Sequence, residues 1–183
     1  MYRLFVAIDL PDEVKNAVDG IVGRDLTGAR RVPREQFHLT LRFIGDADEQ
    51  MFQAVKKELA SVGVIPFSLT IKGVGHFPPK REPRVLWVGM EESAYLHELH
   101  KKIEQSICNA GAAADERRFS PHITIARLRA TPLAKVASLE EKHREFGAGP
   151  FPVEEFYLYS SILTREGAIH KREALFRLEP GTL

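Results

Sequence analysis

The sequence predicts an α+β fold in two pseudo-symmetric lobes with mostly antiparallel strands. Segments with strand and helix periodicity alternate along the chain, and several strands are separated by turns typical of hairpins. The order strand, helix, motif strand, helix occurs twice, which indicates duplicated lobes. No linker is long enough to separate independent units, so residues 1–183 are expected to form a single two-lobed domain.

The first elements follow from apolar patterning and turn residues. Leu4–Ile8 is a short apolar run, which predicts a buried strand. Pro11 suits a first helical position, and the apolar residues after it, from Val14 to Ile21, have the spacing of a helix that faces a core. The basic, turn-rich segment Gly28–Pro33 is expected to be a connection.

Strict alternation between residues 37 and 43 predicts a half-buried strand. Its apolar members, Phe37 to Phe43 at every second position, are expected to enter the core. His38, Thr40 and Arg42 are expected to share the opposite face.

The remaining elements are predicted in the same way, from period, breakers and caps. They are a helix from Asp48 to near Gly63, a strand at 67–72, a long basic loop from Gly73 to Arg84, a strand at Val85–Met90, a helix over 96–107, a motif strand near 118–127, a helical segment that Pro132 opens and Gly147 and Gly149 close, and strands near 153–161 and 169–178 joined by a turn at Arg165-Glu166-Gly167.

One pattern occurs twice, as His38-Leu39-Thr40-Leu41 and as His122-Ile123-Thr124-Ile125. With this composition about 0.05 matches to His-apolar-Thr-apolar are expected by chance, treating positions as independent. In each strand the histidine and the threonine would share one face while both aliphatic side chains enter the core. Two such strands can direct two imidazoles and two hydroxyls at one cleft.

This set of side chains suits phosphoryl transfer. The ordinary pKa of histidine lies near 6.5, so one imidazole can accept a proton while the other donates one. Thr40 and Thr124 can hold the phosphate oxygens. The symmetry of the motif leaves open which histidine is the acid.

Two arginines could add phosphate contacts. Arg42 lies four residues after His38 and is therefore expected on the same strand face. Arg127 lies five residues after His122, so it reaches the cleft only if the strand bulges or ends before it.

Composition excludes several other classes. The net charge of +1 gives no global attraction for nucleic acid, and the single Cys108 provides neither a disulfide nor a zinc-ligand set. The absence of His-Glu-x-x-His and Gly-Lys-Ser/Thr patterns leads us to expect no metal and no cofactor. The N-terminal apolar run is too short for a signal peptide and no stretch could span a membrane, so a cytoplasmic protein is expected.

Three segments resemble the 2H phosphoesterase superfamily, and in particular its RNA 2′,3′-cyclic phosphodiesterases, also called 2′-5′ RNA ligases. The segments are Met1–Pro11, Phe37–Gly45 and Pro121–Arg127, with weaker likeness at 73–78, 84–89 and 156–160. The resemblance implies an α+β fold whose mostly antiparallel sheets line a central cleft, with helices on the outside. It also implies metal-independent hydrolysis of RNA 2′,3′-cyclic phosphate ends to 2′-phosphates, with reversible 2′-5′ ligation in some members. His38 would be the proton donor and His122 the proton acceptor.

Residue type suggests substrate contacts, and the resemblance implies the partner. Tyr159 is a candidate for substrate binding by stacking, as are Phe77, Trp87 and Tyr157, and His170 is a candidate to approach substrate. The expected partner is RNA with a 2′,3′-cyclic phosphate end, or a cyclic nucleotide, and the protein is expected to be a monomer. Two alternatives stay open: a phosphodiesterase for small nucleotides such as an ADP-ribose cyclic phosphate, and a non-catalytic RNA- or nucleotide-binding module.

Overall fold

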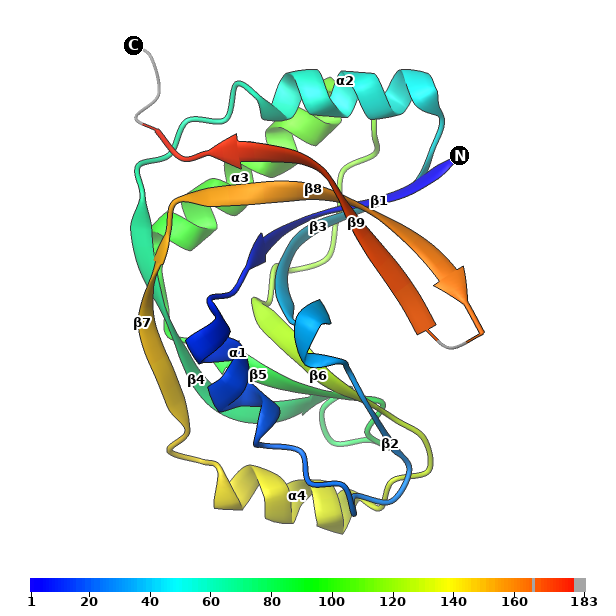
Figure 1. Cartoon of the computed structure of the whole chain (residues 1–183), viewed down its shortest axis with the longest axis vertical. Helices are drawn as coiled ribbons and strands as arrows, with labels where there is room; N and C mark the ends of the chain where they lie inside the picture. The colour runs from blue at the N-terminus through cyan, green and yellow to red at the C-terminus, as the bar shows by residue number, and fades with distance from the viewer. Residues whose placement is uncertain (166, 180–183) are drawn as a thin grey trace.

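Two antiparallel sheets form the body of the molecule in the computed structural model, which describes residues 1–165 and 167–179 (Figure 1). The first sheet, in the order β3-β1-β8-β9, contains β1 (Tyr2–Asp9), β3 (His38–Ala47), β8 (Glu155–Thr164) and β9 (Gly167–Arg177). The second, in the order β2-β6-β5-β4-β7, contains β2 (Ala29–Arg31), β4 (Phe67–Phe77), β5 (Val85–Met90), β6 (His122–Leu128) and β7 (Gly147–Val153). The predicted α+β class with antiparallel pairing is confirmed.

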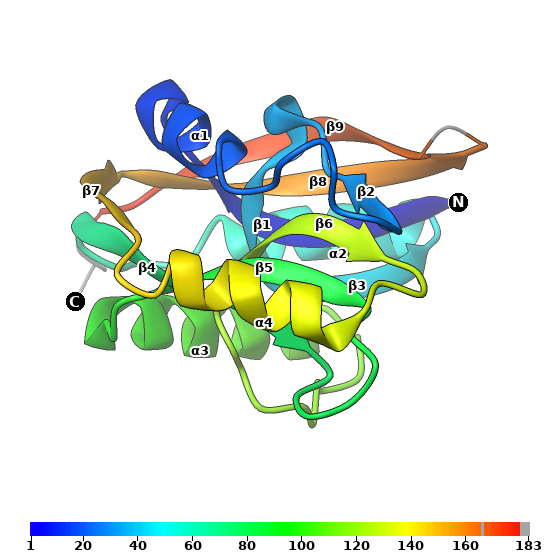
Figure 2. The ribbon, with the colours of Figure 1, turned by 90° about the horizontal axis from the view of Figure 1, so that it is seen from below.

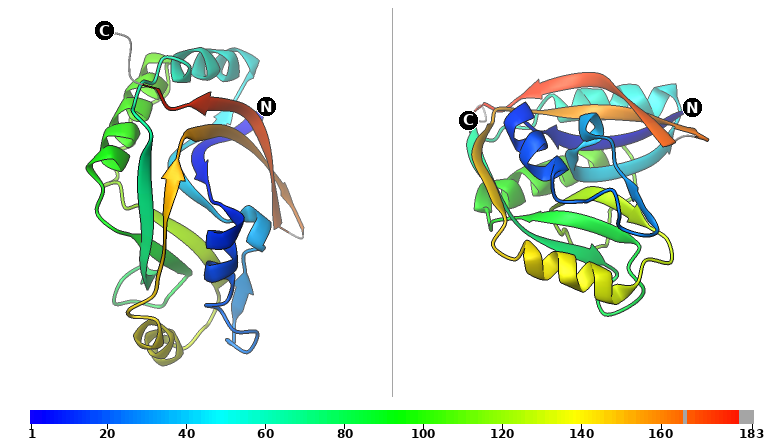
Figure 3. Two further views of the ribbon diagram at one scale, coloured as in Figure 1. Left: turned by 60° about the vertical axis from the view of Figure 1, so that its left-hand side comes forward. Right: turned by 60° about the horizontal axis from the view of Figure 1, so that its bottom comes forward.

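The helices cover the outer sides of these sheets. They are α1 (Asp12–Asp19), α2 (Glu49–Leu59), α3 (Ala94–Asn109) and α4 (Leu133–Lys142), with a short 3-10 helix η1 (Arg34–Gln36). Asp48 caps the N-terminus of α2, where its carboxylate accepts the Met51 N–H at 2.8 Å, and Ser93 caps α3, where its hydroxyl accepts the Leu96 N–H. Figure 3 shows α2 and α3 packed together, and both contact β3.

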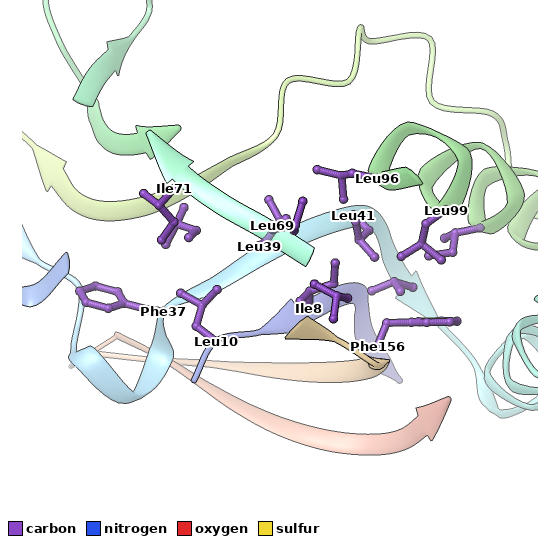
Figure 4. Packing of buried hydrophobic residues seen from close by; sticks show 14 of the residues in the cluster. Ile8, Leu10, Phe37, Leu39, Leu41, Leu69, Ile71, Leu96, Leu99 and Phe156 are labelled. Atoms are coloured by element: carbon purple, nitrogen blue, oxygen red, sulfur yellow. The ribbon is translucent and has the colours of Figure 1, made fainter. Parts of the chain in front are cut away.

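One apolar core joins the two sheets. In Figure 4, Leu39 and Phe156 of the first sheet lie close to Leu69 of β4 and Leu99 of α3, and all four are buried. Burial of these side chains is the dominant favourable contribution to folding. A second small cluster, Phe5, Ala7, Tyr157 and Tyr159, lies on the other face of the first sheet.

The chain crosses between the sheets four times, between β1 and β2, β2 and β3, β3 and β4, and β7 and β8, and two of these crossings are short. Between β2 and β3 it passes from the second sheet to the first through η1, and the Val32 N–H donates to the Ile125 carbonyl at 2.9 Å on the way. Between β7 and β8 only Glu154 intervenes. As a result β3 and β6, the two motif strands, contact each other although they belong to different sheets (Figure 2).

Several predicted bounds differ from the structure because pairing with a neighbour extends or begins a strand. The predicted loop 73–84 is too long, since β4 continues to Phe77 in register with β5. Gly147 and Gly149 belong to β7 instead of ending a helix, and the three-residue β2 lies in the segment predicted as a connection. Strand β6 begins at His122, later than predicted.

Two further points concern the chain as a whole. In the predicted turn Arg165-Glu166-Gly167, Glu166 lies outside the described residues. Among the residues that the structure describes, no helix is long and apolar enough to cross a membrane.

Candidate active site

Strand β3 carries the first motif at the outer edge of its sheet. His38 pairs with Asp9 and Thr40 with Ala7 across β1, so both motif side chains lie on the face of the small aromatic cluster. Both are half-buried, whereas Leu39 is fully buried on the core face. The alternation predicted from sequence places this pair as expected.

A β-bulge at Leu41 reverses the alternation after Thr40. The pairing steps from Thr40–Ala7 to Arg42–Val6, so one extra residue enters β3 and Arg42 turns to the core face. There Arg42 is only 8% exposed and forms an ion pair with Glu104 of α3 at 2.5 Å. The predicted same-face position of Arg42 is therefore wrong, because strict alternation fails at a bulge.

Strand β6 repeats this arrangement. His122 pairs with Gly89 and Thr124 with Trp87 of β5, and the register then shifts so that Arg127 pairs with Val85. The extra residue, Ile125, puts Arg127 on the face of His122 and Thr124, where it is exposed. The condition that the sequence set for Arg127, a bulge before it, is fulfilled.

The two bulges occur at the same motif position, three residues after each histidine. The residue five places after the histidine therefore returns to the motif face in both strands. This residue is Arg127 in β6 but Phe43 in β3, where it is 54% exposed and its ring centroid lies 5.9 Å from that of Phe5. Phe43 was predicted to enter the core, and the bulge overturns that prediction. The backbone geometry is repeated, whereas the charge is not.

Both imidazoles are held by the same kind of hydrogen bond. His38 Nδ1 lies 2.7 Å from the Gln36 carbonyl oxygen, and His122 Nδ1 lies 2.7 Å from the Ser120 carbonyl oxygen. A carbonyl only accepts, so each Nδ1 must donate its proton and each neutral ring leaves Nε2 as an unprotonated acceptor. Each motif thus presents a fixed Nε2 for proton transfer.

Aromatic rings enclose His38. Its ring centroid lies 5.1 Å from Phe5, 6.3 Å from Tyr159 and 5.4 Å from His170, with the His170 ring nearly perpendicular. Burial lowers the pKa of His38 to about 4, and the His170 imidazole also lowers it, although the Gln36 carbonyl acts in the opposite direction. His38 is therefore neutral near pH 7 in the free protein.

His122 has a comparable aromatic setting on the second sheet. Phe77 meets its ring edge-on at 4.9 Å and Trp87 lies at 6.3 Å. Gly75 is needed beside this group, because a Cβ at position 75 would come within 2.3 Å of the Trp87 ring. Burial lowers the pKa of His122, and the nearby Arg127 cation lowers it further, against the effect of the Ser120 carbonyl.

A cavity of about 320 Å³ opens beside His38. Its walls come from β1, α1, η1, β8 and β9, and include Asp9, Lys15, Tyr159 and Arg172. The Asp9 carboxylate pairs with both Lys15, at 2.8 Å, and Arg172. Glu35 adds a second carboxylate to the wall, so the two cations are matched by two acidic side chains next to the catalytic candidate.

The structure also brings in residues that the sequence did not single out. Phe5 lies in a continuous apolar run, so no alternation in the sequence distinguished its position on the face of His38. Asp9 and Arg172 meet only through the pairing of β1, β8 and β9. Tyr159 and His170, both candidates from sequence, do lie beside His38. Among the described residues, no three or more His, Cys, Asp or Glu side chains are grouped to hold a metal ion.

Comparison with known proteins assigns this arrangement to a family. The sequence profile of the 2′-5′ RNA ligase superfamily matches residues 10–164. The chain belongs to this superfamily.

Relatives and solved structures agree with that assignment. A Thermotoga maritima protein named RNA 2′,3′-cyclic phosphodiesterase is 36% identical over 92% of this chain and 91% of its own length. One of the same name from Archaeoglobus fulgidus is 33% identical over 95% and 99%. The crystal structure of E. coli LigT in apo form superposes with a TM-score of 0.79 at 25% identity, covering 97% of this chain and 98% of that one.

The family confirms two predictions from sequence. The resemblance to 2H phosphoesterases is correct, and the chain is an enzyme with cyclic phosphodiesterase activity rather than a non-catalytic binding module. The roles of individual side chains stay predictions, as do the monomeric state and the cytoplasmic location.

Proposed function

We propose that this enzyme hydrolyses 2′,3′-cyclic phosphate ends of RNA to 2′-phosphates by acid–base catalysis between His38 and His122, without a metal ion. The matched imidazole geometry carries the proposal: each Nδ1 is tied to a backbone carbonyl at 2.7 Å, so each Nε2 is fixed and available. The names of the relatives support the substrate class.

In this mechanism His122 Nε2 takes a proton from water as the water oxygen attacks phosphorus. The bond from phosphorus to O3′ breaks, and His38 Nε2 delivers a proton to O3′, which leaves the phosphate on O2′. The hydroxyls of Thr40 and Thr124 and the guanidinium of Arg127 hold the non-bridging oxygens. Atoms and charge balance without any further reactant.

Binding of the substrate is needed to protonate His38, which is neutral in the free enzyme near pH 7. Both histidine pKa values are lowered in the free protein, yet His38 must carry a proton to act as the acid. A bound phosphodiester anion favours the charged form of an adjacent imidazole and raises its pKa. We infer that substrate binding and protonation of the pair occur together.

Ligation uses the same machinery with a different nucleophile. When the 5′-hydroxyl of a second RNA replaces water, the same displacement at phosphorus forms a 2′-5′ phosphodiester and releases O3′. Because both reactions have the same leaving group, His38 and His122 keep their roles, and the balance between hydrolysis and ligation depends on which nucleophile occupies the site.

The test measures turnover of an oligonucleotide that ends in a 2′,3′-cyclic phosphate, in the presence of EDTA. Wild-type turnover should persist, and His38→Ala and His122→Ala should each lose at least 100-fold in kcat, since general acid–base groups contribute about 10²–10⁴-fold. His97→Ala is the matched control, because His97 is a half-exposed imidazole on α3 paired with Glu92. Activity that survives either motif substitution, or that EDTA abolishes, would contradict the mechanism.

A further inference from the structure

The segment that leads into the second motif strand is held by side chains instead of by a sheet. Residues 110–121 connect α3 to β6, and from 116 to 121 no backbone–backbone hydrogen bond joins them to the rest of the described chain. This segment contains Ser120, whose carbonyl oxygen accepts the Nδ1 proton of His122 at 2.7 Å. The position of Ser120 therefore sets the orientation of the His122 imidazole.

The first half of the segment is anchored by Arg42 and Glu104. Arg42 donates to the Ala113 carbonyl at 2.5 Å, and Glu104 Oε1 accepts the Asp115 N–H at 2.8 Å. The two anchoring side chains also pair with each other at 2.5 Å. These contacts end at Asp115, well before Ser120, so they do not by themselves fix the carbonyl that holds His122.

Phe119 anchors the second half of the segment. Its ring lies flat on the imidazole of His100 of α3, with the ring centroids 3.9 Å apart and an angle of 9° between the planes. No other pair of rings among the described residues has centroids so close. His97 reaches the same Phe119 ring only at 5.6 Å, nearly perpendicular and from an exposed position. The stack on His100 is therefore the main contact that places Phe119.

Pro121 makes the connection from Phe119 to His122 stiff. A proline has a fixed φ and restricts the residue before it to extended backbone, so Ser120 has little conformational freedom. Pro121 also has no N–H with which to bond to a neighbouring strand. A displacement of Phe119 is therefore passed on to the Ser120 carbonyl instead of being absorbed between the two residues.

We propose that Phe119, stacked on His100, is a positioning residue for His122 and acts through the Ser120 carbonyl. This role rests on the proposed function, in which His122 is the base. Without the stack, Ser120 moves and the bond to Nδ1 is lost. The neutral His122 ring then carries its proton on either nitrogen, and Nε2 can accept a proton only in molecules with the correct tautomer and direction.

Side-chain ¹⁵N nuclear magnetic resonance at about pH 8, where imidazoles are neutral, measures which nitrogen carries the proton. In the wild type His122 and His38 should both show a protonated Nδ1 and an unprotonated Nε2. In Phe119→Ala and in His100→Ala, His122 should show a mixture of tautomers, while His38, which Gln36 holds, stays unchanged as the internal reference. Phe119→Tyr should keep the wild-type spectrum, because a ring at this position restores the stack.

Steady-state kinetics on a 2′,3′-cyclic nucleotide completes the experiment. In both alanine variants kcat should fall about 10- to 100-fold, since a small misplacement of a reacting group has an effect of this size. KM should stay within about two-fold, because neither ring belongs to the side chains assigned to the phosphate. Tyr95→Ala is the control, since Tyr95 is an exposed aromatic residue of the same helix whose ring stacks on Phe67 instead. It should match the wild type in both measurements.

Each result decides the proposal. An unchanged His122 tautomer in Phe119→Ala or in His100→Ala overturns it. Mixed tautomers at His38 as well, or the same change in Tyr95→Ala, also overturn it, because the effect would then be a general loosening of the fold. If the His122 tautomer changes while kcat does not, positioning by Phe119 is supported, and it is the proposed role of His122 as the base that fails.

Discussion

Removing the positive charge at Arg42 and at Arg127 should affect different properties of the protein, although each arginine lies a few residues after a motif histidine. Arg42→Ala should destabilise the fold and Arg127→Ala should impair catalysis. The bulges in β3 and β6 cause the difference, because they turn Arg42 into the core and Arg127 onto the motif face.

The magnitude for Arg42 follows from its burial and its partners. The side chain is 8% exposed, pairs with Glu104 at 2.5 Å, lies 3.8 Å from Asp115 and donates to the Ala113 carbonyl at 2.5 Å. Truncating one partner of a buried ion pair costs about 3–5 kcal/mol because the other charge is left unpaired. For a chain of this length that corresponds to a decrease in Tm of roughly 10 °C.

The magnitude for Arg127 comes from its role in the proposed mechanism. Its side chain is exposed, so its loss should change the free energy of unfolding by no more than about 0.5 kcal/mol. Hydrogen bonds to a charged group contribute about 1.5–3 kcal/mol, which predicts a decrease in kcat/KM of roughly 10- to 100-fold. Arg127→Lys should recover part of this loss, since a lysine keeps the charge.

Thermal unfolding followed by circular dichroism, together with steady-state kinetics on a 2′,3′-cyclic nucleotide below the Tm of each variant, measures both effects. Glu104→Gln is the control for Arg42, and it should also lower Tm because it removes the charge partner on α3. The reasoning is refuted if Arg42→Ala keeps the wild-type Tm but loses activity, since Arg42 would then act on substrate.

Three other predictions concern the motif histidines and their surroundings. The free energy of unfolding should decrease as pH falls from 6.5 towards 4, because His38 in the unfolded chain takes up a proton at a higher pH than His38 in the native state. In urea unfolding at pH 4.5, His38→Gln should remove about 2 kcal/mol of this loss. An unchanged pH dependence in that variant would contradict the low pKa. The pH profile of kcat/KM should be a bell with both limbs below pH 6.5, because both histidine pKa values are lowered. Arg127→Ala should move the limb that reports His122 to higher pH, because loss of the cation raises the pKa of His122. An optimum above pH 7 would argue against this. Gly75→Ala should displace the indole of Trp87 and lower kcat, and because Trp87 is the single tryptophan, its fluorescence emission should shift. Emission equal to that of the wild type would show that the Trp87 ring does not lie close to position 75.

Much of the fold could be predicted because local patterns and tertiary packing agree. The helices α2 and α3 carry both the apolar spacing and the capping residues Asp48 and Ser93 that the structure uses. The wrongly predicted bounds lie where pairing with a strand distant in the sequence decides the secondary structure. The segment before Phe77 is rich in glycine and resembles a loop, yet β5 pairs with it, and Gly147 lies in a strand because β4 is its neighbour.

The sequence by itself determined the chemistry of the site. The repeated His-x-Thr pattern specifies which imidazoles and hydroxyls share a strand face, because alternation within a strand is a local property of the backbone. The same reasoning set the condition for Arg127, a bulge, without being able to say whether the condition held.

Only the tertiary structure decided which neighbours complete the site. A bulge depends on the register with a partner strand. The spacing in the sequence therefore could not show that Arg42 lies on the core face of its strand and Arg127 on the motif face. The cavity beside His38 requires Asp9, Tyr159 and Arg172 to meet, and residues 9 and 172 are brought together by β8, which pairs with both of their strands. Contacts between residues so distant in sequence arise from sheet order, and sheet order is set by how the whole chain buries its apolar surface.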